Sequence, residues 1–418
     1  MSLSTTYPDH IRAARRITYA LFAGQALGSA GFIATAAIAA IVGAELSGRD
    51  SLAGLPAAVF GVGSALAALL WGLLMDRLGR RSSLTFGLLL GVLGAAGAVW
   101  AVAVGSFWLL LVGLLVMGNA KAALQLSRFV AAEVTPLAQR GRAVATVVLG
   151  GTVGAVVGPL TVAPMGRLAE LNGLPAVSGA YLATLLLFVL SAALIFALLR
   201  PNPRDLARAI EDDETRHRPK RPARPLGQIL RDPAVITAMS AMVFGQAVMV
   251  MLMVMTSLHM VQHDHGLGGV SVVISAHTLG MYAFSLFSGQ LTDRWGRVPV
   301  IVSGAVVLVL SALAAPLSTL LIPLSVSLFL LGLGWNFCFV GGSALLSDQL
   351  SLEERARTQG FNDLLIGLVS AAASFSSGLV FATLGYAAMG ILGALISLVP
   401  LYLTLRWART QRLATQPA

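Results

Sequence analysis

The sequence has 418 residues, of which 57% are hydrophobic and only 11% are charged, and it carries a net charge of +10. Ordinary soluble proteins have roughly 25% charged residues, so this composition, with a mean hydropathy of +0.83, excludes that class. Apolar stretches long enough to cross a hydrocarbon layer of about 30 Å recur along the whole chain. We therefore predict an all-α integral membrane protein.

The apolar stretches predict twelve transmembrane helices. In chain order they cover residues 17–42, 53–75, 83–104, 107–131, 143–164, 178–199, 233–258, 271–291, 300–315, 320–346, 358–384 and 386–406. The opening segment is too polar for a secretory signal, so we expect no cleaved leader. The single cysteine, Cys338, excludes an internal disulfide.

Basic residues are distributed unevenly between the two sides of this topology. Of the 28 lysines and arginines, 24 fall in the termini and loops that share one side. Loops rich in lysine and arginine stay in the cytoplasm, so both termini are predicted to be cytoplasmic. The net positive charge then reflects this topology and the anionic headgroups of the lipid bilayer, and we expect no nucleic-acid partner.

The chain is predicted to have two six-helix halves, residues 1–199 and 233–418, joined by a charged, proline-rich cytoplasmic linker at residues 200–232. The halves carry an internal repeat with a spacing of 217 residues. The repeat relates Gly72, Asp76, Arg77, Gly79 and Arg80 to Gly289, Asp293, Arg294, Gly296 and Arg297, and it relates Asn119 to Asn336 and Arg140 to Arg357.

This G-x-x-x-D-R-x-G-R loop, present in both halves of a twelve-helix chain, resembles the major facilitator superfamily. The resemblance implies secondary transport by two six-helix bundles related by an axis along the membrane normal, with the substrate site near the midplane between them. It assigns the loop residues to gating, as a latch between the halves. Gly154, Gly158 and Pro159 resemble a G-x-x-x-G-P motif of antiporters in this superfamily, although such glycines also serve plain helix packing.

Methionine and histidine gather in one part of the second half. Residues 239–281 hold 12 of the 19 methionines and histidines in the chain. Met251 and Met255 are one helical turn apart, and so are His277 and Met281, so each pair shares one face of its helix. The two helices run antiparallel through a short outer loop, which predicts that the pairs lie at matching depths. Thioether and imidazole groups are ligands that suit copper.

The pattern M-x-x-x-M followed by H-x-x-x-M resembles the bacterial copper importers of the CcoA type. The resemblance implies import of a copper ion across the bacterial inner membrane by alternating access, with copper as the substrate, no cofactor, and a cytosolic copper acceptor as a partner. It makes Met251, Met255, His277 and Met281 the metal-handling residues. In the predicted outer loop above these residues stand His259, His263, Asp264 and His265, which either capture the ion or are simply solvated. The equivalent positions of the first half hold Ala34, Ile38, Phe60 and Ser64, so the fold itself does not require these ligands.

Other residues favour other interpretations. Lys121 lies near mid-membrane, where a cation would repel a metal ion and attract an anionic cargo; an ion pair with Asp363 or Glu133 is another role for it. Cys338, its equivalent in the repeat, is either a further soft ligand or a packing residue. The roles of Asn119 and Asn336 stay open.

The main alternative to copper import is proton-coupled transport, in either direction, of an organic small molecule, with methionines lining an adaptable cavity. The first predicted helix has no carboxylate, which counts against a proton-driven exporter. A sensor that binds copper without transporting it is a further alternative. The chain has no phosphate-binding loop of the Walker type and no grouping suited to hydrolysis, so we do not expect an enzyme.

Overall fold

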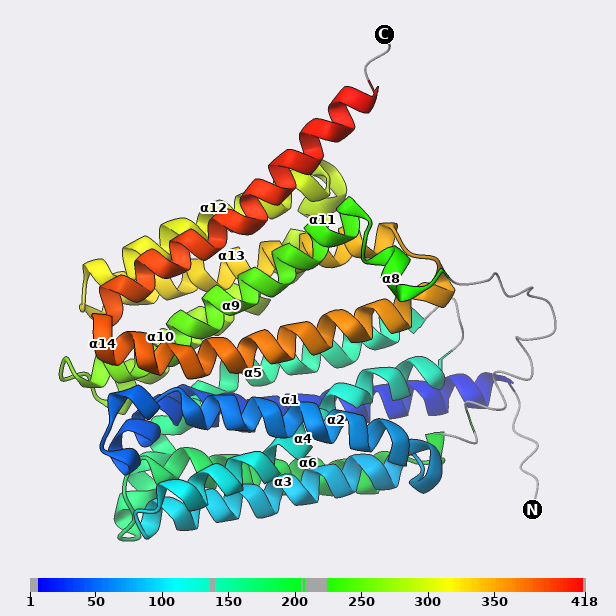
Figure 1. Ribbon diagram of the computed structural model, residues 1–418. Helices are drawn as coiled ribbons and strands as arrows, with labels where there is room; N and C mark the ends of the chain where they lie inside the picture. Colours follow the sequence, from blue (N-terminus) through cyan, green and yellow to red (C-terminus); the bar gives the residue numbers. More distant parts are fainter. Residues whose placement is uncertain (1–6, 136–139, 204–205, 207–223, 416–418) are drawn as a thin grey trace. The chain divides into compact units, whose positions relative to one another are not determined.

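The computed structural model of the protein describes residues 7–135, 140–203, 206 and 224–415 (Figure 1). The described elements are α-helices and two short 3-10 helices, η1 (Asp50–Leu52) and η4 (Ala315–Leu317). The chain divides into two units, one of residues 1–38 and 59–219 and one of residues 39–58 and 220–418. The second unit thus includes the end of the first helix and the start of the second, in addition to the predicted half at 233–418.

Six described helices make up most of the first unit, and all but the last extend, at one end or both, beyond the apolar stretches that predict them. They are α1 (Tyr7–Ser47), α2 (Leu55–Leu78), α3 (Arg80–Ala103), α4 (Phe107–Glu133), α5 (Arg140–Leu171) and α6 (Ser178–Leu198). Helix α3 packs along α4 and α6. Polar residues at the helix ends continue the backbone hydrogen bonding of the helix, although they are not apolar enough to be predicted as part of a membrane span. Helix α1 therefore begins at Tyr7 and not near residue 17.

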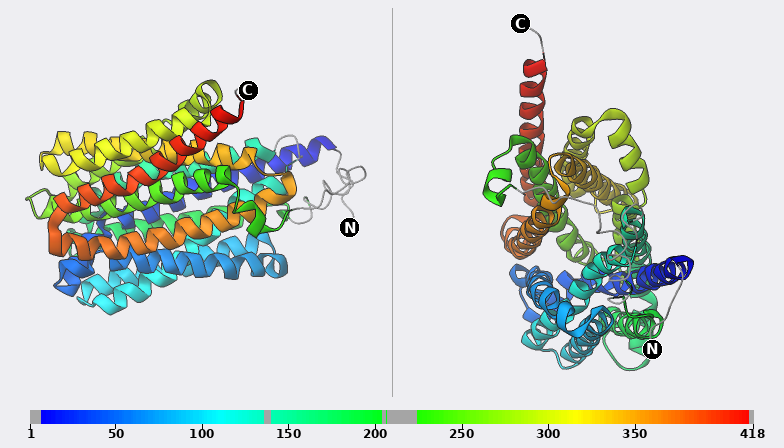
Figure 2. Two further views of the ribbon diagram at one scale, coloured as in Figure 1. Left: turned by 45° about the horizontal axis from the view of Figure 1, so that its top comes forward. Right: turned by 90° about the vertical axis from the view of Figure 1, so that its right-hand side faces the viewer.

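The second unit holds the remaining helices (Figure 2). They are α8 (Leu226–Ile229), α9 (Pro233–Val261), α10 (Leu267–Tyr282), α11 (Ser285–Trp295), α12 (Arg297–Ala314), α13 (Leu321–Asp348) and α14 (Leu352–Thr415). The predicted helix at 271–291 is divided into α10 and α11. Helix α14 turns back on itself at Gly385, whose φ of 75° and ψ of 179° interrupt the helix.

The predicted all-α membrane fold is confirmed. Eleven helical segments within the described residues are long and apolar enough to cross a membrane. The last of these, Arg357–Thr410, has 54 residues and contains the turn at Gly385, so it supplies two crossings. The predicted spans 358–384 and 386–406 meet at this residue.

The repeated loop has the same backbone conformation in both units. Gly79 has a φ of 85° and a ψ of 158°, and Gly296 has a φ of 88° and a ψ of 168°. This region of conformational space is open essentially to glycine alone. Each glycine directly precedes a helix, α3 or α12, so the repeated glycine makes the sharp turn between consecutive membrane helices possible.

The repeated arginines form equivalent ion pairs, each within its own unit. Arg80 Nε lies 2.9 Å from Glu133 Oε2 at the end of α4. Arg297 Nε lies 2.9 Å from Asp348 Oδ2 at the end of α13, and its Nη1 lies 3.7 Å from Asp293 of the same motif. Arg77 and Arg294 are exposed, whereas the burial of Gly72 and the side chains of Asp76 and Arg140 lie outside what the structure describes. A latch between the halves stays a prediction.

The two repeated asparagines join equivalent helices. In the first unit, Trp71 Nε1 of α2 donates to Asn119 Oδ1 of α4 over 3.1 Å. In the second unit, Ser288 Oγ of α11 donates to Asn336 Oδ1 of α13, and Asn336 Nδ2 donates to the Met281 carbonyl over 2.6 Å. Trp71 and Ser288 are themselves 217 positions apart. These asparagines therefore have a structural role.

Helix α5 lies directly against the backbone of α1. A β-carbon at Gly154 would overlap the carbonyl oxygen of Ala26 and would lie 2.6 Å from the amide nitrogen of Ala30. A β-carbon at Gly158 would overlap the Ala30 carbonyl oxygen. Small residues allow membrane helices to approach this closely, so both glycines of the G-x-x-x-G-P motif serve helix packing.

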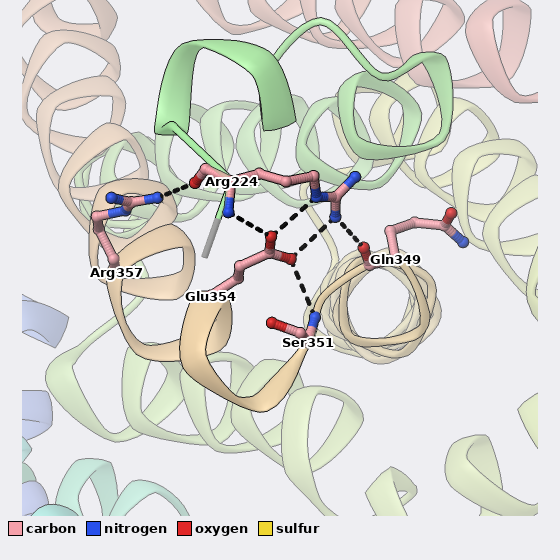
Figure 3. A network of polar contacts seen from close by, with 5 residues as sticks. All are labelled: Arg224, Gln349, Ser351, Glu354 and Arg357. Carbon is pink, nitrogen blue, oxygen red and sulfur yellow. Dashed lines mark hydrogen bonds and ion pairs between the residues drawn. The ribbon is translucent and has the colours of Figure 1, made fainter. Parts of the chain in front are cut away.

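A polar network closes the loop between α13 and α14 (Figure 3). The carboxylate of Glu354 accepts hydrogen bonds from the Arg224 backbone amide and from Arg224 Nε, at 2.9 and 2.8 Å. The Ser351 amide donates to it over 3.0 Å, and Arg224 Nη2 donates to the Gln349 carbonyl over 2.7 Å. Hydrogen bonds from Arg224 hold the pKa of Glu354 well below its ordinary range, and the same pairing raises the pKa of Arg224.

Candidate functional site

The second unit contains an aromatic–amide cluster of Gln246, Tyr282, Trp335 and Phe339, contributed by α9, α10 and α13. Trp335 Nε1 donates to Gln246 Oε1 over 2.7 Å. The rings of Trp335 and Phe339 are stacked, with centroids 4.9 Å apart and an interplanar angle of 22°. Tyr282 meets Trp335 edge-on, with centroids 6.0 Å apart. The hydrogen bond and the stacking fix the indole plane in a membrane-spanning region.

Helical spacing explains why these groups meet. Trp335, Phe339 and Ser343 follow one another at four-residue steps, so they share one face of α13. Trp335 is buried, whereas Gln246, Phe339 and Ser343 are each partly exposed. Aromatic faces beside an amide group can stack on a planar ring while the amide pairs with polar atoms at the ring edge. The cluster therefore suits a planar heteroaromatic ligand.

A buried amide stands near this face. Asn362 of α14 is 3% exposed, and its Oδ1 has no hydrogen-bond partner among the described residues. Its Nδ2 lies 3.6 Å from the Met242 sulfur, to which Ser343 Oγ also donates over 3.3 Å. An acceptor without a donor is costly in an apolar region, so Asn362 Oδ1 can accept a hydrogen bond from a bound solute.

The four predicted copper ligands are all buried in the second unit. Met251 and Met255 of α9 are 3% and 0% exposed, and His277 and Met281 of α10 are 0% and 7% exposed. The His277 ring is turned toward α13, where its Nδ1 lies 2.9 Å from the Leu328 carbonyl oxygen. Helix α10 packs along α13 much more extensively than along α9. The structure thus gives His277 a contact to a third helix that the spacing does not predict.

The His277 hydrogen bond also fixes the tautomer of a neutral ring. A carbonyl oxygen only accepts, so Nδ1 carries the proton and the lone pair is left on Nε2. Nε2 is buried and has no hydrogen-bond partner in the described part of the chain. Histidines that ligate metals commonly donate their other ring nitrogen to a carbonyl in this way.

Of the predicted outer-capture residues, His259 and His263 contact each other, whereas His265 has a different partner. The His259 ring stacks on Tyr386, with centroids 4.3 Å apart at 13°, and lies 4.3 Å from the His263 ring. His265 instead bonds the Thr319 carbonyl through Nε2 over 2.7 Å. Asp264 occupies the loop with a φ of 61°. Within the described ranges, no three histidine, cysteine, aspartate or glutamate side chains are placed to hold a metal together.

The residues with open roles have distinct surroundings. The Lys121 ammonium lies 5.7 Å from the Phe32 ring centroid and 5.4 Å from that of Phe60. Cys338 is fully buried, with its sulfur 3.9 Å from the Ile301 carbonyl oxygen, which supports the packing role. Asp363 is exposed on α14.

Sequence reasoning misses the aromatic–amide cluster as a site. Trp335 stands in the run GLGWNF and Asn362 in QGFND, but a single aromatic residue in an apolar helix gives no signal of its partner. Gln246 is the available clue, because an amide in the middle of an apolar span is costly unless it is hydrogen-bonded. Its partner, Trp335, is 89 residues away in sequence.

The model of the Major Facilitator Superfamily matches residues 21–273 and 249–417 of the sequence. The chain belongs to the major facilitator superfamily. This protein is therefore a multi-pass membrane transporter and not an enzyme. Its fold is similar to that of the nucleoside transporter NupG, with a TM-score of 0.70, 14% sequence identity and coverage of 93% of this chain and 98% of NupG.

Two relatives in the superfamily are similar over most of their length. The uncharacterized MFS-type transporter YdeG of Bacillus subtilis is 35% identical over 387 residues, which cover 92% of this chain and 90% of YdeG. The riboflavin transporter RfnT of Brucella anthropi is 31% identical over 399 residues, which cover 94% of this chain and 97% of RfnT. Neither relative is named for copper, so these relatives support the superfamily and not its copper-importing branch.

Proposed function

We propose that this facilitator carries an organic small molecule with a planar heteroaromatic ring system, and that riboflavin is the first such molecule to test. The observation that carries the proposal is the aromatic–amide cluster, in which Trp335 is held by Gln246 and stacked on a partly exposed Phe339. Similarity to the riboflavin transporter RfnT over 94% of the chain supports the same class of substrate. The bacterial relatives support a place in the cytoplasmic membrane. That both termini lie inside stays a prediction from the basic loops.

Riboflavin chemistry fits the groups that the cluster offers. Its isoalloxazine ring is flat and apolar on both faces, and it carries carbonyl, imide and ring-nitrogen groups along one edge. Phe339 offers a ring face for stacking, while Gln246 and the unpaired Asn362 Oδ1 offer hydrogen-bonding groups. A substrate bound mainly through stacking and a few polar contacts is released readily, as transport requires.

The direct test measures riboflavin binding by the full-length protein in lipid nanodiscs through quenching of flavin fluorescence. We expect the wild type to bind riboflavin and Phe339→Ala to bind it more weakly by about 1–3 kcal/mol, or roughly 5- to 150-fold, because stacking on one aromatic ring is lost. Uptake of radiolabelled riboflavin by cells that lack their own riboflavin transporter should fall in parallel.

A matched control lies on the same helix. Phe329 is also a partly exposed phenylalanine of α13, but its ring meets Phe284 with centroids 5.7 Å apart. Phe329→Ala should therefore leave riboflavin binding unchanged. Riboflavin is the wrong assignment if the wild type does not bind it, and the aromatic–amide cluster is the wrong site if both alanine variants weaken binding equally.

Copper import is the second candidate, because one observation favours it. The buried Nε2 of His277 holds a lone pair without a partner, in a ring oriented by the Leu328 carbonyl. Met281 follows one turn later on the same helix, and Met251 and Met255 are buried on α9. In this candidate the outer histidines bind a copper ion first, and the four side chains then bind it in turn as it moves inward.

The copper candidate is tested by accumulation of radioactive copper in cells that express the protein. In this candidate, the double variant His277→Ala, Met281→Ala abolishes the accumulation above the empty-vector level. Met253→Ala is the control, because Met253 stands between the two α9 ligands in sequence and on another face. Equal copper accumulation in cells with and without the wild-type protein would exclude copper as the cargo.

A further inference from the structure

Lys121 is a charged residue in the middle of an apolar helix. Helix α4 runs from Phe107 to Glu133, so Lys121 is about 20 Å from either end at 1.5 Å per residue. A lysine at this depth is costly, and intramembrane cations face a bundle interior or a water-filled pathway and have a function. Lys121 as a whole residue is partly exposed, so the helix packing does not enclose it completely.

Two aromatic rings flank the ammonium group. Phe32 of α1 and Phe60 of α2 present their rings at 5.7 and 5.4 Å from Lys121 Nζ. A cation near ring faces is stabilised by cation–π attraction, which amounts to only about 0.5–2 kcal/mol. The rings offset part of the positive charge. They are not strong hydrogen-bond acceptors, so they leave the three N–H donors of the ammonium group available to one.

No carboxylate neutralises Lys121 in the described part of the first unit. Glu133, a predicted partner, is bound to Arg80 at 2.9 Å. Glu170 is exposed in the last turn of α5. One turn along α4 from Lys121, the exposed Gln125 lies on the same face and adds an amide donor. Positive charge with an additional N–H donor is the arrangement that binds anions.

We infer that Lys121 binds an anionic group, a carboxylate or a phosphate, of the solute that the protein carries. The inference rests on the proposed function as an organic-solute transporter, and it adds a preference, among planar aromatic molecules, for those with a negative charge over uncharged ones such as riboflavin. Lys121 supplies the charge, Gln125 supplies a neutral donor, and Phe32 and Phe60 hold the ammonium in place and give apolar surface for the ring next to the anionic group.

The test compares ligands of the same shape and different charge. Isothermal titration of the full-length protein in nanodiscs, with empty nanodiscs subtracted, measures binding of 2-naphthoate, 2-naphthyl phosphate and the neutral 2-naphthamide. We expect the wild type to bind at least one anion about tenfold or more tightly than the amide, because a charge-assisted hydrogen bond is gained. The comparison of the two anions decides between carboxylate and phosphate.

Substitution at Lys121 assigns the preference to this side chain. Lys121→Gln should bring the anion-to-amide affinity ratio close to one, while Lys121→Arg should retain a ratio above one. Lys121→Met, which is similar in length and uncharged, replaces the glutamine variant if that variant does not fold. The inference is overturned if the wild type shows no preference for either anion, if the uncharged variants keep the preference, or if they weaken all three ligands equally.

A negative result in this experiment can be told apart from a negative result in the riboflavin experiment. The naphthalene probes contain no flavin, so a wild type that binds no riboflavin and still prefers an anion loses only the flavin assignment. Binding of riboflavin that depends on Phe339, without any charge preference, leaves the proposed function standing and removes the role of Lys121.

Discussion

Replacing Gly154 with alanine is expected to destabilise the protein by about 1–3 kcal/mol, because overpacking against a rigid neighbour costs this much. The new methyl group would overlap the Ala26 carbonyl oxygen and stand 2.6 Å from the Ala30 amide nitrogen. Both atoms belong to the backbone of α1, which cannot move aside as a flexible side chain can. The two helices must therefore separate, and their packing is lost along the contact.

Gly151→Ala is the matched control for this substitution. A β-carbon at Gly151 would meet only side-chain atoms, the nearest being Gln25 Nε2 at 3.4 Å. Both variants change glycine to alanine in the same helix and gain the same intrinsic helix propensity. Thermal unfolding of the purified proteins in one detergent should show a lower transition temperature for Gly154→Ala alone. Equal transition temperatures would show that the α1–α5 contact is looser than described.

Replacing Glu354 with glutamine is expected to destabilise the protein near neutral pH and to flatten the acid side of its pH–stability profile. Hydrogen bonds from Arg224 hold the pKa of Glu354 below its ordinary value of 4.5. A carboxyl group whose pKa is lowered by folding stabilises the folded state fully above its ordinary pKa. That contribution is lost as the pH falls from this value toward the folded pKa. Glutamine keeps the shape of the side chain but has no charge to lose.

Thermal unfolding of wild type and Glu354→Gln between pH 3.5 and pH 8, in buffers of matched ionic strength, measures this difference. The gap between their transition temperatures should be constant above about pH 5.5 and should narrow below about pH 4.5, since protonation removes the charge from the wild type. Glu170→Gln, at an exposed carboxylate of α5, should follow the wild type throughout. A gap that does not change with pH would show that the network does not depend on the charge of Glu354.

The fold could be predicted from the sequence to the level of individual spans. Each apolar stretch is long enough to cross the bilayer, and a glycine or proline often marks where it ends. The boundary between the last two predicted helices at Gly385 is confirmed by its φ of 75°. The break between α10 and α11 could not be predicted, because Ala283 and Phe284, the residues at the break, are neither glycine nor proline.

The candidate site could be predicted only in part, because helical spacing places a residue on a face and does not say which helix the face meets. His277 and Met281 share a face of α10 as expected, yet the His277 ring bonds the Leu328 carbonyl of α13. Trp335 and Gln246 come from helices that are far apart in sequence, and no sequence pattern predicts their hydrogen bond. The depth of Lys121 in the membrane was readable from α4 alone, whereas its two phenylalanine neighbours come from α1 and α2.

The two arginine–carboxylate pairs at the helix ends show how the ancient duplication has drifted. Arg80 and Glu133 are 53 positions apart, whereas Arg297 and Asp348 are 51 positions apart. Leu350 occupies the position that corresponds to Glu133. The acid of the second pair, Asp348, therefore lies two residues before the position equivalent to Glu133, and its side chain is one methylene shorter. The nitrogen–oxygen distance is 2.9 Å in both pairs. The two halves thus share an arginine–carboxylate pair but not the position of its acid, so mutational scans that transfer residues between the halves by position alone would overlook the true counterpart.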